Sequence, residues 1–250
     1  MTQLQGKIAL VTGGAGGFGE GIARLFVAQG ARVMIADLDG AKASQVAADL
    51  GSSARAVACD VSKSADVQAA VQACVDAFGV PDIVVNNAGT THRSQPMLDV
   101  DEATFDRVFN VNVKSIFHMT RAVLPLMRQR KQGSIINVGS TAGIRPRPGL
   151  TWYNASKGAV NVMSKSMAAE LGPDNIRVNA ICPVMGATGL IEQFLGTADT
   201  PESRAKVVAG IPLGRLSTPD DVAQAALYLA SDASCFITGV ELPVDGGRTI

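Results

Sequence analysis

Short apolar runs alternate along the whole chain with longer stretches that carry apolar residues at helical spacing. The apolar runs cover residues 7–12, 31–37, 54–61, 82–89, 134–140, 176–183 and 239–247, and the helical stretches cover residues 20–30, 41–51, 65–79, 101–130, 154–172 and 220–232. Most apolar runs are continuous, which indicates strands that are buried on both faces. Repeated alternation of strand and helix predicts an α/β fold with a doubly wound parallel sheet.

A single domain is expected over residues 1–250. No Pro/Ser-rich linker, block of like charge or low-complexity tract interrupts the alternation. Pro125 lies inside an expected helix, and we interpret it as a kink rather than a domain boundary. A hydrophobic content of 47% in 250 residues is enough for one large core.

Composition narrows the class of partner. Lys and Arg number 22 together, as do Asp and Glu, so the charge balance argues against nucleic acid and anionic membranes and favours a small-molecule substrate. Cys59, Cys74, Cys182 and Cys235 have no C-x-x-C spacing, so neither a disulfide framework nor a metal site is predicted. The apolar run near the start is too short for a signal peptide or a membrane span, and we expect a cytoplasmic protein.

A glycine cluster, TGGAGGFGEG, follows the first expected strand. It fits G-x-G-x-x-G through Gly14, Gly16 and Gly19, and T-G-x-x-x-G-x-G through Gly13, Gly17 and Gly19. Glycines at such a turn permit positive φ and let the backbone approach a pyrophosphate, which the next helix N-terminus stabilises. The sequence therefore predicts a dinucleotide site, with contacts from Gly13, Gly16, Gly17, Phe18 and Gly19.

Asp37 ends the second expected strand, where dinucleotide folds place the acidic residue that binds ribose. A carboxylate there accepts hydrogen bonds from ribose hydroxyls and repels a 2′-phosphate. The alternative is that Asp37 caps the next helix or turn. Because the glycine loop contains no Lys or Arg that would attract a 2′-phosphate, we expect NAD rather than NADP as the cofactor.

Tyr153 and Lys157 stand one helical turn apart in TWYNASKGAV. Tyrosine is a poor acid or base near neutrality because its ordinary pKa is about 10. An ammonium about 4 Å away favours the phenolate by about 4 kcal/mol at an effective dielectric constant of 20, or roughly three pKa units, before desolvation subtracts. We therefore expect Lys157 to lower the pKa of Tyr153 and make it an acid/base, although an ordinary surface pair would have the same spacing.

The order of the motifs resembles that of the short-chain dehydrogenase/reductase family, and in particular of its 3-oxoacyl-carrier-protein reductases. The resemblance rests on TGGAGGFG at 12–19, NNAG at 86–89 and Tyr153-x-x-x-Lys157, and it extends through DV at 60–61, FNVNV at 109–113, Ser140, RVNAICP at 177–183 and VDGG at 244–247. It implies a single-domain Rossmann fold with a seven-stranded parallel sheet and helices on both faces. It also implies a homo-oligomer, commonly a tetramer.

The same resemblance implies roles for individual residues. Tyr153 would be the acid/base, Lys157 would hold the nicotinamide ribose, Ser140 would hydrogen-bond the substrate oxygen, and Asn112 would organise a water that relays protons. Further cofactor contacts are expected from Asp60, Val61, Asn87, Ala88, Gly89, Tyr153, Lys157, Pro183 and Thr188. Val184 stands where the family's P-G-x-x-x-T motif has glycine, so the local backbone geometry is not carried over.

Residues 186–215 are longer than a simple strand-to-helix connection requires, and they include a short apolar helical face at 190–195. We expect a substrate lid around 186–215, with an oligomer contact as the alternative. Arg145 and Arg147 precede Tyr153 and would suit a carboxylate or phosphate, although loop arginines are more often simply solvated.

The expected activity is interconversion of a secondary alcohol and a ketone, with NAD as the hydride carrier and without a metal. Alternatives are a 3-oxoacyl-carrier-protein reductase and a sugar or polyol dehydrogenase. RQRK at 128–131 favours the docking of a carrier protein, whereas GPDN at 172–175 and Asp37 argue against it. A non-catalytic protein that senses the nicotinamide cofactor is less favoured, because all four expected catalytic residues are present.

Overall fold

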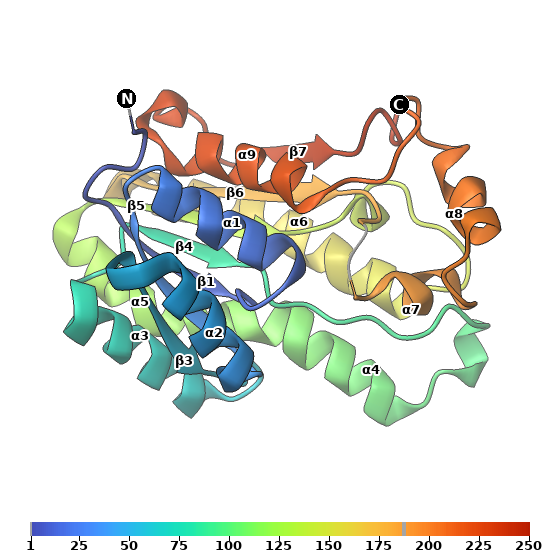
Figure 1. The fold of residues 1–250 in the computed structure, drawn as a ribbon, viewed down its shortest axis with the longest axis horizontal. Helices are drawn as coiled ribbons and strands as arrows, with labels where there is room; N and C mark the ends of the chain where they lie inside the picture. Colours follow the sequence, from blue (N-terminus) through green and yellow to red (C-terminus); the bar gives the residue numbers. More distant parts are fainter. Residues whose placement is uncertain (1, 187–188) are drawn as a thin grey trace.

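The computed structural model describes residues 2–186 and 189–250. Seven parallel strands form one sheet in the order β3-β2-β1-β4-β5-β6-β7 (Figure 1). They are β1 (Ile8–Thr12), β2 (Arg32–Asp37), β3 (Ala54–Ala58), β4 (Ile83–Asn86), β5 (Gly133–Val138), β6 (Ile176–Pro183) and β7 (Glu241–Val244). The expected doubly wound, seven-stranded parallel sheet is confirmed.

Helices cover both faces of the sheet. They are α1 (Gly17–Ala28), α2 (Gly40–Leu50), α3 (Ser64–Phe78), α4 (Glu102–Phe109), α5 (Ser115–Arg130), α6 (Thr151–Leu171), α7 (Ile191–Leu195), α8 (Pro201–Val208) and α9 (Pro219–Ala230). Apolar residues of α1, α2 and α9, such as Phe26 and Leu227, pack on one face. Apolar residues of α3, α5 and α6, such as Met119 and Leu171, pack on the other.

The long helical stretch expected at 101–130 is divided. Asp101 caps α4 by accepting a 2.7 Å hydrogen bond from the Thr104 N–H, and a π-helical segment, Asn110–Lys114, joins α4 to α5. Helix α5 continues through Pro125. The wider π turn displaces the residues of this segment from regular helical spacing, and such turns occur frequently at functional sites.

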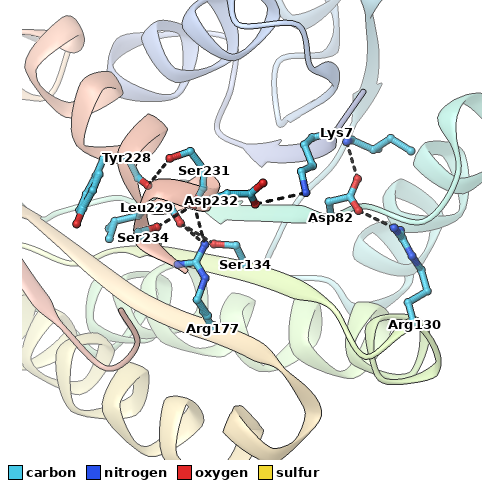
Figure 2. A network of polar contacts seen from close by, with 11 residues as sticks. Lys7, Asp82, Arg130, Ser134, Arg177, Tyr228, Leu229, Ser231, Asp232 and Ser234 are labelled. Atoms are coloured by element: carbon cyan, nitrogen blue, oxygen red, sulfur yellow. Dashed lines mark hydrogen bonds and ion pairs between the residues drawn. The ribbon is translucent and has the colours of Figure 1, made fainter. Parts of the chain in front are cut away.

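Polar contacts tie together the amino ends of several strands (Figure 2). Asp82 accepts a 2.8 Å hydrogen bond from the Ile8 N–H and pairs with Arg130 at 2.6 Å. Arg177 donates a 2.8 Å hydrogen bond to the Leu229 carbonyl. This network lies where β1, β4 and β6 begin, so the opposite, carboxyl end of the sheet is left for the loops that form the pocket.

Within the described part of the chain, each helix is either too short or too polar to cross a bilayer.

Candidate active site

A large pocket opens at the carboxyl ends of the strands. Its volume is about 1040 Å³. It spans the carboxyl ends of β1 and β4, between which the strand order changes: β1 to β3 are added on one side and β4 to β7 on the other. Parallel α/β sheets bind ligands at this position. The pocket is lined by most of the residues expected from the sequence: Gly13, Gly16, Gly17, Phe18, Asp37, Asp60, Val61, Asn87, Ala88, Gly89, Ser140, Tyr153, Lys157 and Pro183.

Two expected site residues lie behind the pocket wall, and one lies outside the described residues. Gly19 is buried against Gly13, where an added Cβ would come within 2.1 Å of the Gly13 carbonyl oxygen. Asn112 is buried in the π-helical segment. Thr188 falls outside the described residues. The pocket therefore gathers residues from widely separated parts of the sequence into one site.

The glycine loop has the shape that an anion site requires. Gly13 and Gly17 have φ angles of +62° and +55°, which side chains with a Cβ rarely adopt. Within the described chain, no side chain caps the N-terminus of α1, whose N-cap residue is Gly16. The first N–H groups of α1 are consequently available to a phosphate, and the loop fits a dinucleotide.

Thr12 and Asn87 hold this loop against the end of β4. The Thr12 hydroxyl accepts 3.1 Å hydrogen bonds from the N–H groups of Asn87 and Ala88. The Asn87 amide donates in return to the carbonyls of Thr12 and Gly13, at 2.9 and 3.0 Å. Thr12 was not among the expected site residues, although it is the first residue of T-G-x-x-x-G-x-G, and that position is the signal that would have found it.

Asp37 supports the loop rather than capping α2. Its Oδ2 atom accepts a 2.9 Å hydrogen bond from the Ala15 N–H, and its Oδ1 atom accepts one of 3.0 Å from the Asp39 N–H. The N-cap of α2 is Asp39, which accepts from the Lys42 N–H, so Asp37 does not cap α2. The bond from the Asp39 N–H to Asp37 does cap the turn that follows β2, as the alternative reading of Asp37 expected. Each carboxylate oxygen retains a lone pair for a further donor.

Lys42 also reaches the glycine loop. Its Nζ atom lies 3.0 Å from the position that a Cβ on Gly16 would occupy, and it lines the pocket beside Asp37. The glycine loop itself contains no cation, as its sequence indicates, but the first turn of α2 brings one to it. A sequence motif that covers only the loop misses this lysine.

Tyr153 is buried, and it lines the pocket together with Ser140. Burial raises the pKa of Tyr153 to about 12, and this effect outweighs the influence of the Ser140 hydroxyl and of the positive charge of Arg147, which both favour the phenolate. The expectation that Lys157 lowers the pKa of Tyr153 is therefore wrong in this arrangement. Spacing on a helix brings the two Cα atoms close, but it does not fix where a long lysine side chain ends.

The Lys157 ammonium points to the end of β5 instead. Its Nζ atom donates a 2.7 Å hydrogen bond to the Val138 carbonyl, and burial lowers the pKa of Lys157 to about 8. A Cβ added to Gly89 would lie 3.5 Å from this nitrogen and 3.5 Å from Asn112 Oδ1. Lys157 thus faces the pocket beside the glycine that closes NNAG.

Asn112 connects residues of the pocket wall through hydrogen bonds. Its Oδ1 atom accepts from the Thr90 N–H at 2.8 Å, and its Nδ2 atom donates to the Thr90 carbonyl and to Ser156 Oγ, both at 2.9 Å. Both amide hydrogens are therefore engaged in holding the loop after β4 to α6.

Comparisons with known proteins agree with this geometry. Residues 13–249 match the family model described as enoyl-(acyl carrier protein) reductase. The chain is 48% identical to a 4-formylbenzenesulfonate dehydrogenase of Comamonas testosteroni, over 99% of both chains, and 38% identical to a 2-(S)-hydroxypropyl-CoM dehydrogenase of Xanthobacter autotrophicus, over 99% of this chain and 98% of the relative. A crystal structure of 3-ketoacyl-(acyl-carrier-protein) reductase from Brucella melitensis complexed with NADH superimposes with a TM-score of 0.93 at 47% identity, covering 99% of this chain and 100% of that one.

The chain belongs to the short-chain dehydrogenase/reductase family. It is accordingly an oxidoreductase that acts on CH–OH groups, and the resemblance seen in its sequence is confirmed.

In this short-chain dehydrogenase/reductase, described residues of the segment 186–215 line one wall of the pocket. Its described residues include α7 and α8, which lie at the right of Figure 1. The ring of Phe194 on α7 meets the ring of Tyr153 edge to face, with centroids 5.1 Å apart. Arg147 donates a 2.7 Å hydrogen bond to the Phe194 carbonyl. The expected lid segment therefore touches Tyr153.

Proposed function

We propose that this chain is an NAD(H)-dependent oxidoreductase that interconverts a secondary alcohol and its ketone. The observation that carries the proposal is that Ser140, Tyr153 and Lys157 line one pocket together with the glycine loop. When bound, the nicotinamide cofactor supplies the hydride for reduction and takes it up in oxidation. The residues that would hold it are the glycine loop, Asp37 and Lys157.

Tyr153 donates the proton in reduction and accepts it in oxidation. Its raised pKa keeps the hydroxyl protonated at neutral pH, so in reduction Tyr153 donates its Oη proton to the carbonyl oxygen while the carbonyl carbon gains the hydride. Ser140 donates a hydrogen bond to the same oxygen and stabilises its developing negative charge. In oxidation, Tyr153 must first lose its proton, which the positive charge of Arg147 favours and burial opposes.

The pattern that favoured carrier-protein docking loses support in the folded chain. Arg128 of RQRK pairs with Asp174 at 2.7 Å, and Arg130 pairs with Asp82 at 2.6 Å. These carboxylates neutralise much of the basic charge at 128–131, including through Asp174 of GPDN. We therefore retain a small alcohol or ketone as the substrate, ahead of an acyl carrier protein.

We further propose that residues 186–215 act as a substrate lid. Contact of Phe194 with Tyr153 supports the lid.

We also propose that the chain forms a homotetramer in the cytoplasm. Exposed apolar side chains near the C-terminal strand, including Phe236 and Tyr228, support an assembly surface. Four free thiols suit a reducing compartment. Light scattering should give a mass near four times 25.8 kDa; a monomer would contradict the assembly.

A screen of ketones and secondary alcohols tests the activity. Absorbance of reduced nicotinamide should fall with NADH and a ketone, and rise with NAD and the matching alcohol. Quenching of protein fluorescence by NADH, measured separately, should show saturable binding. Binding without turnover of any compound would replace the proposed activity with the cofactor-sensing alternative.

A further inference from the structure

One end of the pocket is lined by cations and by none of the carboxylates of the described lining. The carboxylates of the described lining are Asp37 and Asp60, and both follow or end strands on the β2–β3 side of the sheet. The lining contributed by the loop before α6, by α8 and by the C-terminal tail contains Arg145, Arg147, Lys206 and Arg248. The chain as a whole is formally neutral, so this separation is a local property of the pocket.

Arg147 is the cation of this group that lies closest to the chemistry. Its charge acts on Tyr153, and its guanidinium donates to the carbonyl of Phe194, whose ring contacts the Tyr153 ring. Arg147 is half-buried, and burial lowers its pKa. Arg147 therefore lines the pocket where the lid meets the tyrosine.

The guanidinium of Arg147 has few hydrogen-bond partners among the described residues. Within the described residues, its one hydrogen bond is the 2.7 Å bond from Nη2 to Phe194, although a guanidinium carries five N–H donors. None of the described carboxylates forms an ion pair with it. A partly desolvated cation without a counter-ion is costly, and an anionic ligand in the pocket would offset that cost.

We propose that the substrate is a compact organic anion, a ketone or alcohol bearing a carboxylate or sulfonate, and that Arg147 binds its anionic group. This inference rests on the proposed function and names its substrate class. The flat guanidinium matches the paired oxygens of either group, which favours bidentate recognition. The pocket thus recognises the anion at Arg147 and performs the redox reaction at Tyr153 and Ser140.

Matched ketones test the inference. The probes are 4-acetylbenzoate, 4-acetylbenzenesulfonate and the neutral methyl 4-acetylbenzoate, together with acetoacetate and methyl acetoacetate. At least one anion should have a kcat/KM more than about tenfold above that of its neutral counterpart, as expected for a charge-assisted hydrogen bond. Comparison of the carboxylate with the sulfonate identifies the preferred anion. Equal use of the neutral esters would overturn the proposal.

Arg147→Gln should raise KM for the anions by about 10- to 100-fold more than it raises KM for the neutral ketones. A purely structural role, such as support of Phe194, would instead reduce turnover of both classes alike. Arg121→Gln, on α5 and outside the pocket lining, is the control and should preserve the preference for anions. Equal losses for both classes in Arg147→Gln would refute recognition of the anion by Arg147.

Calorimetric titration of the NADH-loaded protein separates this inference from the proposed activity. The 4-acetylbenzoate anion should bind the unaltered protein more tightly than its methyl ester, and Arg147→Gln should abolish the difference. Selective binding of the anion without turnover would leave the inference standing while contradicting the proposed activity. Turnover without selectivity for the anion would support the proposed activity and contradict recognition of the anion by Arg147.

Discussion

Lys157 and Val138 are joined by a 2.7 Å hydrogen bond from the lysine Nζ atom to the backbone carbonyl at the end of β5. Both residues are buried. The bond holds the ammonium at the carboxyl end of β5, beside Gly89. Lys157 is therefore held as part of the pocket wall, and its burial makes its protonation sensitive to pH in the mildly alkaline range.

The free energy of unfolding should rise between pH 8 and 10, by about 2 kcal/mol relative to a Lys157→Met variant. Burial lowers the folded pKa of Lys157 to about 8 from an ordinary value of 10.5, so in this window the unfolded chain holds a proton that the folded chain has released. Urea denaturation at fixed protein concentration measures the difference. A difference that stays constant with pH would contradict the burial of the ammonium.

Tyr153 should lower the free energy of unfolding as pH rises above 10. Its folded pKa is raised to about 12 from 10.0, so the neutral hydroxyl stabilises the fold below pH 10 and that contribution is lost as pH rises toward 12. A Tyr153→Phe variant should keep the stability gain between pH 8 and 10 and lack this loss.

Tyr153→Phe should also lower kcat by about 100-fold or more, because it removes the hydroxyl that transfers the proton and keeps the ring that packs on Phe194. Stopped-flow measurement of ketone reduction gives kcat, and fluorescence titration with NADH should give an unchanged Kd. Turnover close to that of the unaltered protein would remove Tyr153 from its assigned role.

Asp37→Ala should shift cofactor preference toward NADPH by roughly tenfold, equivalent to about 1.4 kcal/mol of removed repulsion. Lys42 lies beside the same part of the loop and would then attract the 2′-phosphate. Titration of both reduced cofactors measures the shift. Adding Lys42→Gln to Asp37→Ala should reverse much of the gain; a gain that persists would show that Lys42 plays no part.

Gly19→Ala should destabilise the fold by about 3 kcal/mol, because its Cβ would lie 2.1 Å from the Gly13 carbonyl oxygen and 2.4 Å from Asn87 Nδ2. Gly158→Ala is the matched control. It lies within α6, where the new Cβ would meet no described atom within 4 Å apart from its chain neighbours and the nearby backbone of the helix, and it should stabilise the helix by about 0.5–1 kcal/mol. Equal denaturation midpoints for the two variants would contradict the close packing of the loop.

The sequence predicted the sheet well because most strands are continuous apolar runs, a pattern that depends on local composition. Most of the site residues that it predicted also line the pocket, because motifs at strand ends meet at one edge of a parallel sheet. The end points of long side chains were less predictable: Lys42 reaches the glycine loop from α2, and Lys157 bonds to Val138. The π-helical turn at 110–114 was also missed, since one extra residue per turn leaves little trace in a hydrophobic pattern. The individual roles of the site residues stay predictions.

The separation of charge along the pocket has a kinetic consequence. With no net charge on the chain, attraction of an anion from solution must come from the cationic end of the pocket, including Arg147 and Arg248. Such a field extends over only about 10 Å at 0.1 M salt. The association rate of an anionic ketone should therefore fall as ionic strength rises, whereas that of a neutral ketone should remain constant. The salt concentration around the enzyme would thus set how fast it binds an anionic substrate.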